Sequence, residues 1–317
     1  MAFLFKLLAV DKALSIQAHP HKSLAEQLHA NRPDLYKDDN HKPEIAIALS
    51  DDFTACFGFL TPLRLKQNLL ENPVLAEAFG VTQETEVNED FLRECVRKMF
   101  FDFDKEQDKL EVLITKLVAA VQASAEKTEH QKLLLTLKEQ YGTRDIGLIF
   151  VFFLNVLKLS SGQALVITPN EPHAYISGDL VECMSNSDNV VRGGLTPKYK
   201  DTETLFNMLP YDSMNTERTA VSGSLYQSTK SGAAVEYKTG FEEFRVFKVE
   251  TEGEAEPVAL RFSAFTMAVV VKGEGAIEVE GFGKFKVHES CAYYIMPERE
   301  FRVSGEGLTV FLANCDI

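Results

Sequence analysis

Three short stretches of the 317-residue chain hold most of its unusual polar residues. The first reads Leu-Ser-Ile-Gln-Ala-His and ends at His19. If Ser15–His19 is a strand, Ser15, Gln17 and His19 point to one face, while the apolar residues between them point to the other. A polar face turned into a small barrel is costly unless it binds something, and a metal ion is such a ligand. A solvent-facing edge strand with one polar side is the alternative.

The second stretch is Asn40-His-Lys-Pro-Glu44, which precedes an apolar run. Pro43 holds Lys42 extended, and this fixes the directions in which His41, Lys42 and Glu44 project. An imidazole, an amine and a carboxylate within four residues could supply a metal ligand, a charge and a proton-transfer group. Taken alone, the stretch is more often a charged turn before a strand.

The third stretch begins at Pro169 and continues to Lys198. Its Pro-His-Ala-Tyr segment, at the start of a predicted strand, places His173 and Tyr175 on one face. Further along, Arg192 and Lys198 stand beside glycines that let the backbone approach a ligand closely. A local cationic spot in an acidic chain suits a phosphate, and the fork of Arg192 is the better shape for bidentate recognition.

The bulk composition excludes several functional classes. A formal charge of -14 and a pI near 5.0 argue against sequence-independent binding to nucleic acid or to an anionic membrane. The five cysteines are widely spaced, without a Cys-x-x-Cys pair, as expected in a reducing compartment. The apolar start of the chain is short and lacks a cleavage pattern. We therefore expect a cytoplasmic protein that is not anchored in a membrane.

The elements that must position these residues follow from the hydrophobic period, which changes twice along the chain. Residues 1–61 indicate strands and tight loops, and residues 62–142 indicate helices. One helix face is predicted by apolar residues at three-and-four spacing. Its members are Leu110, Leu113, Ile114, Leu117, Val118 and Val121.

Local signals predict the limits of three helices. Asn88 is a suitable N-cap for a helix over Phe91–Met99, and Gly142 a suitable C-cap after Leu133–Tyr141. The apolar run Ile146–Leu157 predicts a further helix that returns the chain to a sheet.

After that run the signals are again those of strands. A short helix is expected around Leu205–Leu209, and the polar segment Tyr211–Gly240 is interpreted as a connection between domains. From Phe241 onwards strands dominate, with Gly273-Glu-Gly275 as a hairpin turn after the strand Thr266–Val271. Strands at such spacing suggest a sandwich or a jelly roll.

Six motifs, in this order, together resemble type I mannose-6-phosphate isomerase, also called phosphomannose isomerase. They are Gln17-Ala-His-Pro20, His41-Lys-Pro-Glu44, Asn170-Glu-Pro-His-Ala-Tyr-Ile-Ser-Gly-Asp179, Val181-Glu-Cys-Met184, Ser187-Asp-Asn189 and Arg192-Gly-Gly-Leu-Thr-Pro-Lys198. Each motif alone is weak, but six in order are specific. The resemblance implies an α+β fold. Residues 1–61 and 159–225 would form a cupin-like β jelly-roll core, 62–158 an inserted α-helical domain and 226–317 a C-terminal β jelly-roll domain.

The resemblance also implies a metal and a reaction. One Zn²⁺ per chain would be held by Gln17, His19, Glu44 and His173, a nitrogen and oxygen ligand set in which the amide is the unusual member. The reaction would interconvert mannose 6-phosphate and fructose 6-phosphate through a cis-enediol. Arg192 would lie near the phosphate or the developing enediolate.

Further residues in or near the matching motifs are expected to take part in the reaction. With Arg192, the expected catalytic residues are His41, Asp188 and Lys198, and which of these three is the proton-transfer base stays open. The expected substrate-binding residues are Ser15, Lys42, Glu182 and Tyr175. The partner would be a small-molecule sugar phosphate, with no nucleic acid and no membrane, and we expect a monomer.

The chain also departs from the family pattern. Members usually carry an N-terminal region with a Tyr-x-Trp-Gly motif before the segment that matches Phe3-Leu-Phe-Lys-Leu-Leu8, whereas this chain starts at that segment and has no Trp. We therefore expect an exposed sheet edge. A non-catalytic module that binds a metal or a sugar phosphate is one alternative. A cupin-type oxygenase is another alternative. The metal sites of such enzymes usually contain several histidines and a carboxylate, and they leave coordination positions on the metal open.

Overall fold

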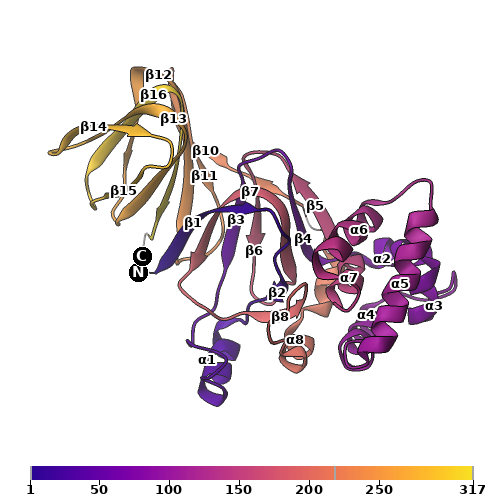
Figure 1. Ribbon diagram of the computed structural model, residues 1–317. Helices are drawn as coiled ribbons and strands as arrows, with labels where there is room; N and C mark the ends of the chain where they lie inside the picture. Colours follow the sequence, from indigo (N-terminus) through magenta and orange to yellow (C-terminus); the bar gives the residue numbers. More distant parts are fainter. Residues whose placement is uncertain (1, 218, 316–317) are drawn as a thin grey trace.

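The computed structural model describes residues 2–217 and 219–315. Within these residues the fold mixes eight α-helices with a nine-stranded and a seven-stranded sheet. Figure 1 shows the first sheet in the middle of the molecule, the second sheet at one end and most of the helices at the other. The helices found in the described residues include none that is both long and apolar enough to span a membrane.

The first sheet is built from nine strands that come from distant parts of the chain. They are β1 (Phe3–Val10), β2 (Ile16–Ala18), β3 (Glu44–Ala48), β4 (Phe53–Phe59), β5 (Leu154–Leu159), β6 (Gln163–Ile167), β7 (His173–Ser185), β8 (Val191–Gly194) and β9 (Val221–Ser222). The second sheet contains seven strands. They are β10 (Ser224–Thr229), β11 (Gly232–Tyr237), β12 (Arg245–Arg261), β13 (Thr266–Val279), β14 (Gly283–His288), β15 (Ala292–Ile295) and β16 (Glu300–Asn314).

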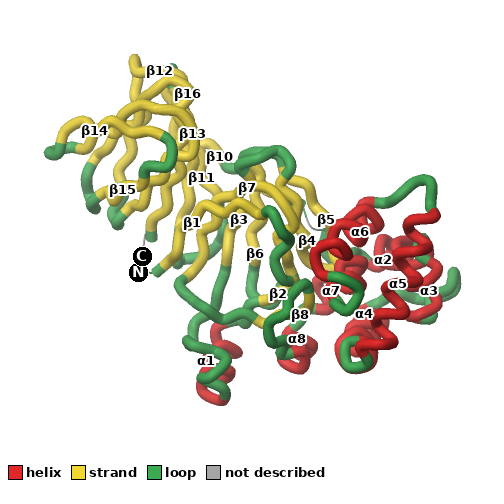
Figure 2. The backbone as a smooth tube through the Cα atoms, in the orientation of Figure 1, coloured by secondary structure: helices red, strands yellow, loops and turns green. Residues whose placement is uncertain are grey.

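The helices lie mainly in the segment between β4 and β5. They are α1 (Lys22–Asn31), α2 (Pro62–Leu70), α3 (Pro73–Phe79), α4 (Glu89–Arg97), α5 (Gln107–Ala123), α6 (Glu129–Tyr141), α7 (Gly147–Phe150) and α8 (Thr202–Met208). Short turns of other helix types are η1 (Lys98–Phe103), η2 (Val151–Phe153) and η3 (Tyr211–Asn215). In Figure 2 the helices α2 to α7 form one group beside β4 and β5, while α1 stands apart from it. The helix α8 contacts this group through Phe206, whose ring centroid lies 5.4 Å from that of Phe101.

Strand β7 organises the first sheet because its two halves pair with different neighbours. Near His173 it pairs antiparallel with β2 and β4, and beyond Gly178 it lies between β1 and β3. Gly178 has φ +99°, and a Cβ there would lie 2.7 Å from the Cα of Phe53. The absence of a side chain at Gly178 therefore lets β7 change partners without a clash. Among the described residues β1 pairs with β7 alone, which confirms the expected sheet edge.

The predicted limits of the helical segment are confirmed in part. The Asn88 side chain accepts a hydrogen bond from the backbone N–H of Phe91, and the backbone N–H of Gly142 donates to the carbonyl of Lys138. The predicted face of α5 is buried at Leu110, Ile114, Leu117, Val118 and Val121. The short helix expected near Leu205 is α8.

The expected helix over Ile146–Leu157 is wrong in its second half. Helical structure ends at Phe153, and the chain continues as β5, paired with β4. The amide Nδ2 of Asn155 donates to the carbonyls of Phe57, Gly58 and Phe59, where β4 bulges. Pairing with a strand almost a hundred residues earlier therefore outweighs the local apolar pattern.

A helix also forms where only strands and loops were expected. In α1 the ring Nδ1 of His21 accepts the backbone N–H of Leu24 at 3.3 Å and so caps the helix. The side chains of Leu24 and Leu28, four residues apart, pack against the core. This spacing was the missed signal.

The segment Tyr211–Gly240 is more than a connection. It contains η3 and the hairpin of β10 and β11, which joins the second sheet through β12. Most side chains of β10 and β11 are at least partly exposed, with Ala234 and Tyr237 the buried ones. The pattern of apolar residues that would predict these two strands is therefore weak.

The hairpin turn expected at Gly273-Glu-Gly275 is also wrong, because these residues lie inside β13. A Cβ on Gly273 would lie 2.4 Å from the carbonyl oxygen of Gly307, and one on Gly275 2.2 Å from that of Ser304. The glycines therefore permit a close approach between β13 and β16, where the register shifts.

Candidate metal centre

Three buried side chains from three strands of the first sheet meet at one point. His19 follows β2, Glu44 begins β3 and His173 begins β7, and each is 1% exposed. One ligand atom from each lies within 4.8 Å of the others. The fold thus brings His173 next to two residues that lie more than a hundred positions before it in the sequence.

The Glu44 carboxylate stands between the two imidazoles. Its Oε1 lies 3.4 Å from His19 Nε2, and its Oε2 lies 3.5 Å from His173 Nε2. The ring centroids of His19 and His173 are 5.0 Å apart. Two ring nitrogens and one carboxylate therefore surround a single small volume.

Backbone carbonyls fix the tautomer of both histidines. The Nδ1–H of His19 donates to the carbonyl of Asn189 at 2.7 Å, and that of His173 to the carbonyl of Glu171 at 2.9 Å. Because a carbonyl only accepts, Nδ1 carries the proton in the neutral form of each ring, and Nε2 then keeps a lone pair. Among the described residues His19 Nε2 has no hydrogen-bond partner. A buried lone pair of this kind fits a metal ion, which would satisfy it.

Gln17 lies beside this cluster. Its backbone is in register with His173 across β2 and β7, and its Nε2 lies 3.5 Å from His173 Nε2. Its Oε1 accepts a hydrogen bond from Ser15 Oγ at 3.2 Å. Since an amide binds a cation through oxygen, Gln17 could join the ligand set only by turning its amide.

The charge of the cluster is set by Glu44 and Lys42. Burial acts to raise the pKa of Glu44, but its interactions with His19 and Lys42 outweigh burial, and the pKa lies well below the usual range. Lys42 Nζ stands 3.1 Å from Glu44 Oε1. Burial lowers the pKa of His19 to about 4, so this imidazole is neutral near pH 7. A buried carboxylate beside neutral imidazole is suited to a divalent cation.

A second buried carboxylate lies next to the first. The hydroxyl of Tyr175 donates to Glu182 Oε1 at 3.1 Å and faces Glu44 Oε2 at 3.5 Å. Burial and the charge of Glu44 raise the pKa of Glu182, although Lys6, 2.8 Å from Glu182 Oε2, acts against this. Burial raises the pKa of Tyr175 well above its usual value. Lys6 was missed from the sequence, where its signal was a single cation in the apolar strand β1.

Arg192 lies on β8 opposite Gln17 in the strand register. Directly opposed residues on paired strands project to the same face of a sheet. The guanidinium is half-buried, and burial lowers its pKa below the ordinary value. Arg192 thus presents a positive group on the face that carries Gln17.

The other expected catalytic residues are Lys198, Asp188 and His41. Lys198 and Asp188 are exposed on loops, and His41 forms an ion pair with Glu243. Among the described residues no hydrogen bond or ion pair links any of these three to Glu44. The structure therefore does not select one of them as a proton-transfer base.

The backbone acceptors at Asn189 and Glu171 were not anticipated. Every residue has a backbone carbonyl oxygen, so residue type does not indicate which carbonyl accepts a hydrogen bond from a histidine. The only available signal was position, because both residues lie in motifs that also contain candidate site residues.

Comparisons with known proteins place this site in a wider context. A family model described as the catalytic domain of type I phosphomannose isomerase matches residues 1–61. The chain is 37% identical to mannose-6-phosphate isomerase 2 of Arabidopsis thaliana, over 96% of this chain and 70% of that protein. It is 36% identical to isomerase 1 of the same plant, over 88% and 65%. Its identity to the mannose-6-phosphate isomerase of Schizosaccharomyces pombe is 32%, over 100% and 80%.

Solved structures share the fold. A mutant of phosphomannose isomerase from Salmonella typhimurium superposes with a TM-score of 0.83 at 24% identity, and the match covers 100% of this chain and 79% of that one. A crystal structure of mannose 6-phosphate isomerase bound with zinc and yttrium gives 0.82 at 24% identity, with coverage of 100% and 80%. At this level of identity the likeness concerns the fold.

Proposed function

We propose a function on the premise that the chain belongs to the mannose-6-phosphate isomerase family, a family of isomerases. The proposed reaction interconverts mannose 6-phosphate and fructose 6-phosphate through a cis-enediol, with one zinc ion bound to the chain. The observation that carries the proposal is the buried cluster of His19, Glu44 and His173, in which the Nε2 lone pairs face one carboxylate. The zinc bound in the crystal structure of a relative with the same fold adds support.

The proposed ligands are Gln17, His19, Glu44 and His173. When bound, the ion would polarise the substrate carbonyl and offset negative charge on its oxygen. Lys42 holds the Glu44 carboxylate in place at 3.1 Å. Burial excludes water from this volume and strengthens the electrostatic interactions within it.

The remaining residues would bind the substrate and move its proton. Arg192 would hold the phosphate or the developing enediolate through its forked N–H groups. The proposed substrate-binding residues are Ser15, Lys42, Tyr175 and Glu182. A base moves the proton between C2 and C1, and such a positioned base contributes about 10²–10⁴-fold to the rate. His41, Asp188 and Lys198 remain the candidates, and with Arg192 they complete the proposed catalytic set.

We extend the proposal to the fold and the partners. The two antiparallel sheets are proposed to be a cupin-like jelly roll and a C-terminal jelly roll. The partner is proposed to be a small sugar phosphate, and the protein a cytoplasmic monomer. It is proposed to bind neither nucleic acid nor a membrane. A net charge of -14 supports the last point.

A coupled isomerase assay on the purified chain, with zinc measured in the same sample, tests the proposal. We expect about one zinc per chain and formation of fructose 6-phosphate from mannose 6-phosphate. His173→Ala should lose both, whereas the control His288→Ala, an exposed histidine on β14, should keep both. Full turnover by metal-free protein would refute the proposal. Zinc and ligand binding without turnover would favour the non-catalytic alternative.

A further inference from the structure

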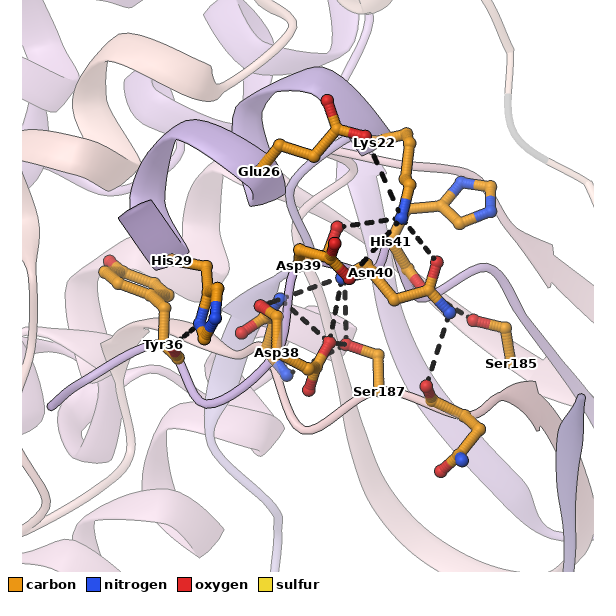
Figure 3. A network of polar contacts seen from close by, with 12 residues as sticks. Lys22, Glu26, His29, Tyr36, Asp38, Asp39, Asn40, His41, Ser185 and Ser187 are labelled. Atoms are coloured by element: carbon orange, nitrogen blue, oxygen red, sulfur yellow. Dashed lines mark hydrogen bonds and ion pairs between the residues drawn. The ribbon is translucent and has the colours of Figure 1, made fainter. Parts of the chain in front are cut away.

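The loop after β7 is tied to the segment before β3 by several hydrogen bonds, and the Asp38 side chain takes part in three of them. Asp38 accepts hydrogen bonds from three donors of this loop, as Figure 3 shows in part. The donors are Ser187 Oγ at 2.8 Å, the backbone N–H of Asp188 at 2.8 Å and Asn189 Nδ2 at 3.2 Å. The backbone N–H of Asn40 donates to the same carboxylate at 2.9 Å. The Asp38 carboxylate therefore accepts hydrogen bonds both from the loop after β7 and from Asn40 in the segment before β3.

The loop in turn holds a metal-site histidine. Asn189 is 1% exposed, and its amide also donates to the carbonyls of Asp38 at 2.8 Å and Asn40 at 2.9 Å. Its backbone N–H donates to Ser187 Oγ at 3.1 Å. The carbonyl of Asn189 accepts the Nδ1 proton of His19 at 2.7 Å. A continuous chain of hydrogen bonds thus runs from Asp38 to His19.

We propose that Asp38 is a positioning residue that fixes the Asn189 carbonyl and thereby the tautomer and direction of His19 Nε2. In the part of the chain that the structure describes, the Asp38 carboxylate bonds to Asn40, Ser187, Asp188 and Asn189, none of which is a proposed ligand. This inference rests on the proposed function, because it assigns a purpose to a zinc site. Partners that orient a metal-ligating histidine typically contribute about 10- to 100-fold to metal affinity.

The role requires a carboxylate. Ser187, Asp188, Asn189 and Asn40 all present donors to Asp38, and a carboxylate is the side chain that only accepts. In Asp38→Asn one oxygen becomes an NH₂ group, which faces donors and must break at least one of these bonds. The neighbouring Asp39 provides a matched control, because its side chain is 64% exposed and pairs at 3.6 Å with Lys22 at the surface.

The first experiment compares the zinc dissociation constants of the wild type, Asp38→Asn and Asp39→Asn by chelator competition. Asp38→Asn should bind zinc about 10- to 100-fold more weakly, with Asp39→Asn unchanged. Equal affinity in all three proteins would overturn the proposal. Thermal unfolding of the metal-free proteins identifies a variant that simply fails to fold. In that case Ser187→Ala, which removes one link of the chain, must weaken zinc binding for the proposal to stand.

The second experiment reads the ring of His19 in the metal-free proteins by long-range ¹H–¹⁵N NMR. The wild type and Asp39→Asn should show His19 with its proton on Nδ1, and Asp38→Asn should show a mixture of tautomers. An unchanged His19 pattern in Asp38→Asn would refute the positioning role. Failure of the wild type to bind zinc would instead refute the proposed function, and the NMR comparison would still decide the role of Asp38.

Discussion

Glu44 is a buried carboxylate whose surroundings keep it ionised. Near pH 7 the neutral His19 does not balance its charge, because burial lowers the pKa of that imidazole to about 4. Lys42, 3.1 Å away, is the cation that does so. A buried charge is tolerated only when it is paired, and pairing here leaves two Nε2 lone pairs beside an ionised carboxylate. The interactions with His19 and Lys42 together lower the pKa of Glu44, and the paired carboxylate beside the two Nε2 atoms fits a divalent cation.

Replacing Glu44 with Gln removes the negative charge while keeping the size and shape of the side chain nearly unchanged. Glu44→Gln should weaken zinc binding by more than about 100-fold, beyond the range typical of residues that only orient ligands. Isomerase activity should fall in parallel. Chelator competition measures the affinity, and circular dichroism checks that the variant is folded. Zinc affinity equal to that of the wild type would show that Glu44 is not a ligand.

At the scale of single elements, one side chain supports the contact between β4 and β5 in addition to their backbone pairing. Asn155→Ala removes the amide that donates to three carbonyls of the β4 bulge. Because three carbonyls of β4 then lose a buried donor, the free energy of unfolding should fall by about 1–3 kcal/mol. Urea unfolding of the metal-free protein measures this. The control Lys158→Ala, on the same strand but exposed, should change it by less than about 0.5 kcal/mol. Equal effects of the two substitutions would contradict the role of Asn155.

The helix α6 carries a group whose ionisation opposes folding in acid. His130 Nε2 donates to the carbonyl of Leu154 at 2.9 Å, and the ring stacks on Phe152. Burial lowers the pKa of His130 below its ordinary value of 6.5. Below pH 6.5 the unfolded chain therefore binds this proton more readily than the folded chain, and stability falls as the pH falls.

His130→Gln should remove this part of the pH dependence. Between pH 7 and pH 5.5 the wild type should lose more free energy of unfolding than the variant, as measured by urea unfolding at each pH. The control is His29→Gln, because His29 lies in α1 and is not part of the contact between α6 and Leu154. The same loss in wild type and His130→Gln would mean that His130 does not resist protonation.

Local sequence signals predicted those elements whose limits are set by neighbouring residues. Asn88 and Gly142 act on backbone groups within four positions, so their roles as helix caps could be foreseen. The strand β5 could not, because the apolar run before Leu159 fits either a helix or a buried strand until β4 is known. Gly273 likewise resembles a turn residue, although its purpose is a close approach to Gly307 across the sheet.

At the scale of the whole molecule, metal binding and folding should be coupled. The proposed ligand groups, on or next to β2, β3 and β7, converge only in the folded chain, so zinc should bind the native state in preference to the unfolded state. At a free zinc concentration about 100 times the dissociation constant, the stabilisation should be about 2.7 kcal/mol. Chelation should lower the melting temperature of the wild type. The metal-free protein and His173→Ala should show no such shift, and an equal shift in His173→Ala would contradict the coupling.

The candidate site was predictable as a list of residues but not as an arrangement. The motifs around Gln17, Glu44 and His173 supplied the proposed ligands, and the structure brings His19, Glu44 and His173 together. The exposure of Lys198, the pairing of His41 with Glu243 and the contact of Lys6 with Glu182 depend on how distant segments pack. No local pattern encodes such contacts.

X-ray diffraction recorded at the zinc absorption edge, from crystals of the chain with one equivalent of zinc, tests the central claim most directly. The account predicts a single strong anomalous peak about 2.0–2.2 Å from His19 Nε2, His173 Nε2 and an oxygen of Glu44. A zinc peak bound elsewhere, with these three side chains still in contact only with one another, would contradict it.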